Sequence, residues 1–173
     1  MSSLIEVLKR RNRTVLWVSF APTRVPTLVL RGVVGGIIAT AIMTLYRFPV
    51  FRALPPTAEF WASVVSGGKP EQYPVIAFFL HFVYGAGAGG VFGYLFSKLR
   101  FRSERERRLG ATVLALCYGV ALSVFGTRVI FRHILDERLE PDEAIIFHVG
   151  HVIYGLTLGT WMSSREQVGD VYE

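Results

Sequence analysis

Charged residues are scarce in this 173-residue chain. Asp, Glu, Lys and Arg make up 18% of it, against 51% hydrophobic residues, and the mean hydropathy is +0.41. Soluble domains usually contain about 25% charged residues. The composition therefore argues against a soluble domain and indicates a membrane protein.

Cysteine is nearly absent as well. Cys117, the only one, lies within an apolar stretch. One cysteine allows neither a disulfide within the chain nor a metal site built from several thiolates. We interpret Cys117 as a small buried hydrophobe.

Four stretches carry no charge over most of their length. They span residues 27–46, 74–96, 109–127 and 144–162, and each approaches or exceeds the length of about 20 apolar residues that a membrane helix needs. Their continuous hydrophobicity favours helices over the alternating strands of a membrane barrel. The sequence thus predicts an all-α integral membrane protein with one four-helix transmembrane domain over residues 27–164.

Basic residues gather on one side of the predicted membrane. The arm of residues 1–26 and the connection at 98–108 are basic, whereas the connection at 128–143 is mainly acidic. The positive-inside rule therefore places the arm, the 98–108 connection and the tail of residues 165–173 in the cytoplasm. We expect a multi-pass protein of the cell (inner) membrane with both termini cytoplasmic.

The same basic residues suggest a partner. They lie in blocks between apolar spans and form no soluble face with interleaved aromatic residues, so we expect anionic lipid headgroups at the cytoplasmic face and no nucleic acid. Residues 1–26 form either an interfacial amphipathic helix or a basic tail.

A short helix is expected in the first outer connection. Two prolines and Thr57 precede the segment 58–61, and Gly67 and Gly68 follow. This order predicts a helix that Thr57 caps and the glycines end. Its apolar stripe favours a position on the outer interface.

The motif His-x-x-Tyr-Gly occurs twice, at residues 81–85 and 151–155. Each copy lies in the second span of a half, after an irregular outer connection that contains proline. This repetition predicts two parallel two-helix repeats, related by an axis along the membrane normal, that form a bundle. His81 and His151 would then lie at matching depth, about 10 Å from the outer ends of their helices.

Glycines recur at a spacing of four residues in three spans. Small residues at this spacing allow helix backbones to approach closely in lipid, so we interpret them as packing residues. They are Gly32, Gly36, Gly85, Gly89, Gly93, Gly155 and Gly159.

Three interpretations of the membrane histidines stay open. In the first, which we favour and which needs no cofactor, the imidazoles form hydrogen bonds with neighbouring helices and so fix the register of the helices. Each such hydrogen bond contributes about 0.6–2 kcal/mol. In the second, His81 and His151 hold a haem axially, or hold a divalent metal together with His148. In the third, they serve an oligomeric transporter or a proton relay.

No pair of nucleophile and base, and no carboxylate pair within a span, has a spacing that suits catalysis. We therefore expect no enzymatic activity. The favoured role is that of a structural or accessory membrane module, acting in a homo-oligomer or a larger membrane complex.

Three segments carry a resemblance to a known family. Residues 85–94, Gly110 at the start of the third span, and residues 147–155 (FHVGHVIYG) resemble the YagU-like group of small prokaryotic inner-membrane proteins. The resemblance covers mainly residues 75–160. It implies a four-helix inner-membrane protein of poorly defined function, for which acid tolerance is one suggested role, and it supplies no catalytic residues. The extra motif at His81 departs from the group's pattern.

Overall fold

The computed structural model describes residues 24–50 and 54–164, and within them every regular element is a helix. Four elements are long: α2 (Arg24–Val50), α4 (Pro74–Ser97), α5 (Glu104–Phe125) and α6 (Pro141–Ser163). Four helices are long and apolar enough to cross a membrane, with α5 counted together with its continuation. The predicted arm of residues 1–26 lies mostly outside the described residues, and the tail of residues 165–173 lies wholly outside them.

Short elements connect the long helices. The connection after α2 contains α3 (Thr57–Phe60), the π-helix η1 (Trp61–Ser66) and the 3-10 helix η2 (Pro70–Gln72). The predicted short helix is therefore present, and it ends before Gly67, whose φ of 70° suits glycine. Thr57 does not cap it, because its hydroxyl donates to the carbonyl of Ala77 in α4 (2.6 Å) and ties the connection to that helix.

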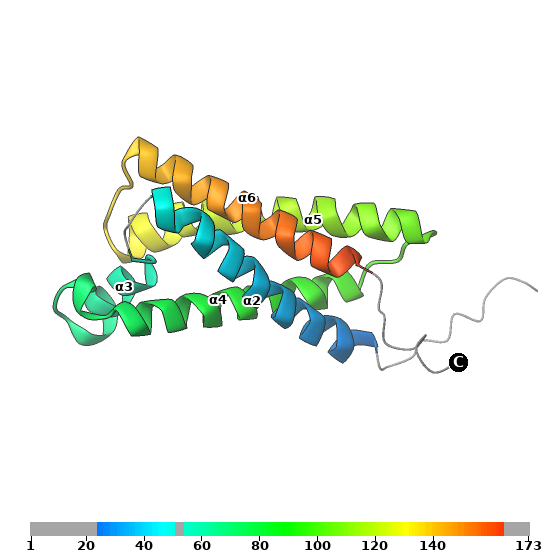
Figure 1. The fold of residues 1–173 in the computed structure, drawn as a ribbon, viewed down its shortest axis with the longest axis horizontal. Coiled ribbons are helices and arrows are strands. Elements are labelled where there is room, and N and C mark those ends of the chain that lie inside the picture. The colour runs from blue at the N-terminus through cyan, green and yellow to red at the C-terminus, as the bar shows by residue number, and fades with distance from the viewer. Residues whose placement is uncertain (1–23, 51–53, 165–173) are drawn as a thin grey trace, which may run out of the picture.

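The helices run lengthwise along one another (Figure 1). We call the end that carries α3 and the 135–140 connection the Glu59 end. The opposite end, which holds the 98–103 turn, the start of α2 and the end of α6, is called the Arg102 end (Figure 1). Both described chain ends therefore lie at the end that carries the basic turn.

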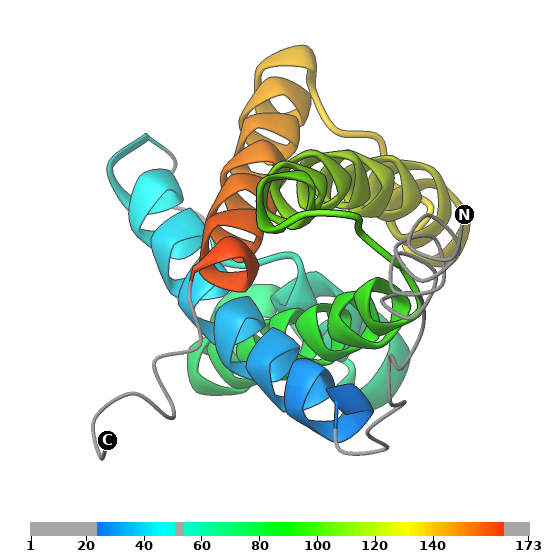
Figure 2. The same cartoon turned by 90° about the vertical axis from the view of Figure 1, so that its right-hand side faces the viewer.

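Packing divides the four long helices into two pairs. α2 packs against α4, α5 packs against α6, and α2 also packs against α6, whereas α4 and α5 have little contact (Figure 2). Each pair consists of two spans that follow one another in the chain. This pairing is what two parallel repeats require, although the repeat itself stays a prediction.

The third span is longer than predicted. Instead of ending at residue 127, α5 continues as the π-helix η3 (Gly126–Ile134), so the continuous helix covers residues 104–134. The sequence rule ended the span at Arg128, but an arginine does not break a helix. Its long side chain can extend along the helix to reach the interface.

Glycines bring α2 and α4 into backbone contact. A Cβ placed on Gly32 would collide with the carbonyl oxygen of Gly89, and one on Gly36 with that of Gly85. Gly93 similarly faces the backbone of Leu28. The glycines at a spacing of four residues on α4 thus lie against the glycines of α2.

The α5–α6 pair uses glycine on one helix and mainly alanine on the other. Gly155 lies against the backbone at Ala115, and Gly159 lies against Thr112 and Ala111. Both alanines are fully buried. Sequence reasoning singled out the glycines of α6 but missed the small residues of α5, because alanine is also a common residue on lipid-facing and ordinary helix surfaces.

Arginines close the Arg102 end. Arg31 of α2 donates to the carbonyl of Trp161 (2.9 Å), and Arg107 of α5 donates to that of Met162 (3.3 Å). These carbonyls belong to the last turn of α6, where backbone acceptors lack helical partners and a positive charge is favourable. The indole of Trp161 donates back to the carbonyl of Arg31 (3.0 Å).

The interpretation of Cys117 is wrong. Its side chain is exposed on α5, because the packed face of this helix is the one that carries Ala111, Ala115 and Gly119. In a membrane, such a surface faces lipid or another protein, so hydrophobicity alone does not predict burial there.

Candidate functional site

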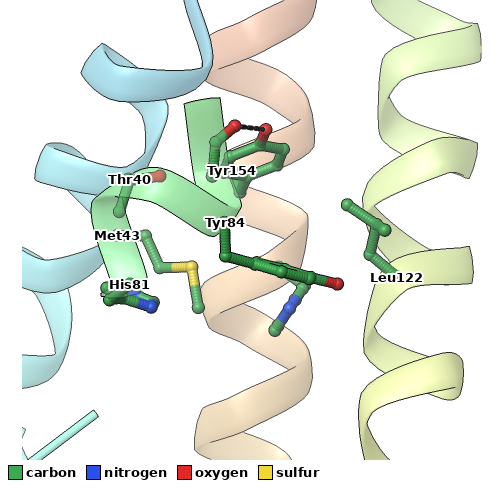
Figure 3. Close-up of a pocket in the computed structure, with 8 residues that line it drawn as sticks. Thr40, Met43, His81, Tyr84, Leu122 and Tyr154 are labelled. Carbon is green, nitrogen blue, oxygen red and sulfur yellow. Dashed lines mark hydrogen bonds between the residues drawn. The ribbon is translucent and has the colours of Figure 1, made fainter. Parts of the chain in front are cut away.

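His81 and His151 line one cavity, which residues of all four long helices enclose (Figure 3). Thr40 and Met43 of α2, Tyr84 and Gly85 of α4, Leu122 of α5 and Tyr154 of α6 complete its lining. The volume is about 20 Å³, which is enough space for one water molecule. The structure thus brings together the two histidines that the repeated motif singled out.

His151 is held by its own helix. Its Nδ1 lies 2.9 Å from the carbonyl oxygen of Phe147, one turn earlier. Because a carbonyl only accepts, Nδ1 carries the proton of this bond, and a neutral ring then keeps its lone pair on Nε2. The ring of Phe147 packs on the imidazole with centroids 4.4 Å apart.

The two copies of the motif differ in burial. His151 and Tyr154 are 7% and 3% exposed, whereas Tyr84 is 45% exposed and His81 is half-buried. Tyr154 donates to the carbonyl of Gly85 (2.8 Å) and so joins α6 to α4, whereas Tyr84 extends from α4 towards Leu122 of α5 (Figure 3). The difference follows from position, since α6 packs against two helices and α4 mainly against one.

The third histidine of the metal hypothesis lies elsewhere. His148 Nδ1 is 2.9 Å from the hydroxyl of the buried Ser123, and His148 does not line the histidine cavity. Within residues 24–50 and 54–164, no three His, Cys, Asp or Glu side chains are grouped so that they could hold a metal ion. A cavity of about 20 Å³ also has no room for a haem between His81 and His151.

A larger cavity lies at the Glu59 end, and we call it the Glu59 chamber. Its volume is about 230 Å³, and five of its lining residues carry charges: Arg47, Glu59, Glu137, Arg138 and Glu143. They come from α2, α3, the 135–140 connection and α6. The chamber therefore joins segments of both halves of the chain.

Apolar side chains form the rest of the Glu59 chamber. Phe131 and Phe147 are buried, and their rings meet edge to face with centroids 5.5 Å apart. Gly126 makes room for Phe147, because a Cβ there would lie 2.7 Å from the ring. Phe147 lines the chamber with one surface and packs on His151 with another, so it separates the two cavities.

Two buried polar atoms of the Glu59 chamber lack a hydrogen bond. They are Nε of Arg47 and Oε2 of Glu59, and neither finds a partner among the described residues. One oxygen of Glu143 is engaged, since it accepts from the backbone N–H of Glu140 (3.1 Å) in the capping box that starts α6. A buried donor or acceptor without a partner costs about 1–3 kcal/mol, so the chamber contains one donor atom and one acceptor atom that the described residues leave without a hydrogen bond.

The charges of the Glu59 chamber alter the titration of Glu59. Burial raises its pKa most, the carboxylates of Glu137 and Glu143 and a hydrogen bond with Glu137 also raise it, and Arg47 lowers it, so that the pKa lies at about 7. The folded protein therefore holds a proton that the unfolded chain releases near the usual pKa of 4.5. Stability from this group is full below that value and is lost as the pH rises through about 7.

Sequence reasoning missed the Glu59 chamber. Its charged residues lie in segments that are far apart in the sequence, and three of them, Glu137, Arg138 and Glu143, counted only as part of an acidic outer connection. Arg47 offered one signal, since an arginine within the last turn of a candidate membrane span needs a counter-charge.

Comparisons with known proteins identify no relative: no protein-family model, curated protein or solved structure matches the chain. The resemblance to the YagU-like group therefore stays a prediction from the quoted residues.

Proposed function

We propose that this protein is a non-enzymatic integral membrane module that stabilises or completes a larger assembly. The distribution of buried polar side chains supports this role. Those in the described residues are Thr40, Ser123 and His151, and all three lie nearer the Glu59 end than the Arg102 end. Towards the Arg102 end the buried core is apolar, with Phe92, Phe96, Leu158 and Met162 among its members. Such a core offers no polar path across the bundle.

In this proposal, His81 and His151 fix helix packing without binding a cofactor. The bond from His151 to Phe147 and the bond from Tyr154 to Gly85 support such a role, because bonds between helices set their register in lipid. Because α4 and α5 have little contact with each other, each helix has a face that the other does not cover. A second copy, or another membrane protein, would bind at these faces.

We further propose that the Arg102 end is cytoplasmic and lies in the cell (inner) membrane, where its basic residues contact anionic lipid. The positive-inside rule supports this orientation, since the basic 98–103 turn lies at the same end as the last turn of α6 (Figure 1), to which Arg31 donates. We also propose that the two halves are parallel repeats, since each half consists of two consecutive spans that pack together.

Cysteine labelling tests the orientation. In a Cys117→Ala background, Lys69→Cys and Arg102→Cys place single thiols at exposed positions of opposite ends. We expect an impermeant maleimide to label Lys69→Cys in intact cells and Arg102→Cys only after lysis, because the positive-inside rule puts Arg102 in the cytoplasm. The reverse pattern would invert the proposed topology.

Reconstitution tests the role of a module. We expect purified protein to be colourless, to contain no stoichiometric metal, and to dissipate a proton gradient across liposomes no faster than empty vesicles do. The apolar core at the Arg102 end is the reason for the last expectation. A Soret band, bound zinc or copper, or proton flux that His81→Ala and His151→Ala both abolish would contradict the proposal.

One observation favours transport as a second candidate function. The Glu59 chamber and the histidine cavity are adjacent, with Phe147 against both. A ligand or proton that entered the chamber would therefore meet His151 next. In that case the apolar core would have to open in an alternate conformation. The reconstitution experiment distinguishes the two functions, because only a transporter would produce flux above that of empty vesicles.

A further inference from the structure

The Glu59 chamber has a composition that few ligands can satisfy. Its lining contains two guanidinium groups, three carboxylates and the rings of Phe131 and Phe147. One buried donor atom of Arg47 and one buried acceptor atom of Glu59 have no hydrogen-bond partner among the described residues. A ligand that supplies both an acceptor and a donor would satisfy these two atoms at once.

Charge excludes simpler ligands. An anion bound at Arg47 would be repelled by Glu59, Glu137 and Glu143, and a cation bound at these carboxylates would be repelled by Arg47 and Arg138. No three described His, Cys, Asp or Glu side chains are grouped so that they could hold a metal ion, which argues against a divalent metal here. A ligand with both charges meets attraction at each end.

Size sets an upper limit. At about 230 Å³ the chamber is smaller than pockets for drug-sized ligands, which begin at about 300 Å³. It therefore suits a small solute or a single headgroup. The aromatic and aliphatic residues Phe131, Ile146 and Phe147 would pack against the short carbon chain between the two charges.

We propose that the Glu59 chamber binds a small zwitterion in which a primary ammonium and an anionic acid group are a few bonds apart. Arg47 donates to the acid group, and Glu59 accepts from the ammonium, with Glu137 beside it. Two sources supply this chemistry: a free amino acid or related solute, and the ethanolamine headgroup of a membrane phospholipid. The site does not depend on the proposed role as a module, because it rests on the chamber alone.

The test uses the full chain, purified in detergent, and follows its thermal unfolding midpoint. Glycine and phosphoethanolamine are the free probes. Glycine betaine and phosphocholine are their matched controls, because three methyl groups on nitrogen remove every N–H donor and leave the charge unchanged. We expect saturable increases in the midpoint with at least one free probe, or with phosphatidylethanolamine in the lipid arm, and smaller or no increases with the methylated controls.

The lipid arm compares nanodiscs of phosphatidylcholine with nanodiscs that also contain phosphatidylethanolamine. An increase in the midpoint with ethanolamine lipid, without one for the free probes, identifies the headgroup as the ligand. Saturable binding of free probes alone identifies a soluble zwitterion. Each of these results supports the proposal, and they differ only in the source of the ligand.

Variants connect binding to the chamber. Glu59→Gln keeps the shape of the side chain and removes its charge, and Arg47→Lys keeps the charge and removes Nε. We expect each to weaken binding at least tenfold, whereas Glu71→Gln, an exposed carboxylate outside the chamber, leaves it unchanged. If Arg47→Lys does not fold, Glu59→Gln alone decides the question.

Three results would overturn the proposal. The first is the absence of any saturable shift with either free probes or ethanolamine lipid. The second is an equal shift with the methylated controls, which would leave no role for an N–H donor. The third is an equal loss of binding in Glu59→Gln and Glu71→Gln, which would mean that the ligand does not bind in the chamber.

Discussion

Gly89→Ala is expected to lower the free energy of unfolding by about 1–3 kcal/mol, the usual cost of overpacking a close contact. The new Cβ would meet the carbonyl oxygen of Gly32 and lie 2.8 Å from Cα of Gly36. Both are backbone atoms, which cannot move aside as the end of a side chain can. The helices α2 and α4 would have to separate along their whole contact.

The same helix offers a matched control. A Cβ on Gly87 would meet nothing within 4 Å, and replacing glycine by alanine in a helix is intrinsically favourable by about 1 kcal/mol. Gly87→Ala is therefore expected to leave stability unchanged or to raise it. Thermal or denaturant unfolding of both variants in one detergent measures the difference. Equal effects of the two substitutions would mean that α2 and α4 do not pack as described.

Hydropathy predicted the helices well because a membrane helix must be apolar for the width of the bilayer. The start of α4 at Pro74 coincides with the predicted start, since proline fits the first turn of a helix. The end of the third span was missed, because the sequence rule treated Arg128 as a boundary although the helix continues through η3 to Ile134.

The candidate site was predictable only in part. The repeated motif predicted that His81 and His151 lie at matching depth, and in the structure the two side chains line one cavity. The motif did not predict that Tyr154 is buried and Tyr84 is exposed, because the periodicity of one helix does not reveal how many neighbours the helix has. The Glu59 chamber is lined by residues of α2, α3, η3, the 135–140 connection and α6, and no local sequence pattern predicts that these segments meet.

Arg47→Met is expected to destabilise the fold more at about pH 8 than at about pH 5, because the ionised fraction of Glu59 rises between these values. Arg47 is the cation that opposes the raised pKa of Glu59, which is about 7. Below this pKa Glu59 is mainly protonated, and the loss of Arg47 removes mostly packing. Above it, the substitution leaves a half-buried carboxylate beside Glu137 and Glu143 without that cation.

The expected cost at the higher pH is about 2 kcal/mol, below the 3–5 kcal/mol of a fully buried pair because the chamber residues keep some contact with water. Glu59→Gln supplies the partner variant for a double-mutant cycle. Alone, it is expected to leave stability unchanged at the lower pH and to reduce the decline of stability as the pH rises. In the double variant Arg47→Met, Glu59→Gln, the loss of Arg47 is expected to cost less than it does alone.

Unfolding midpoints at both pH values, measured for the wild type, the two single variants and the double variant, give the coupling between Arg47 and Glu59 directly. A stability that depends equally on pH in the wild type and in Glu59→Gln would mean that another group is responsible for the pH dependence. Additive effects of the two substitutions at the higher pH would mean that Arg47 and Glu59 do not interact across the chamber. A coupling that appears only above the pKa of Glu59 would identify the ionised carboxylate as the group that Arg47 stabilises.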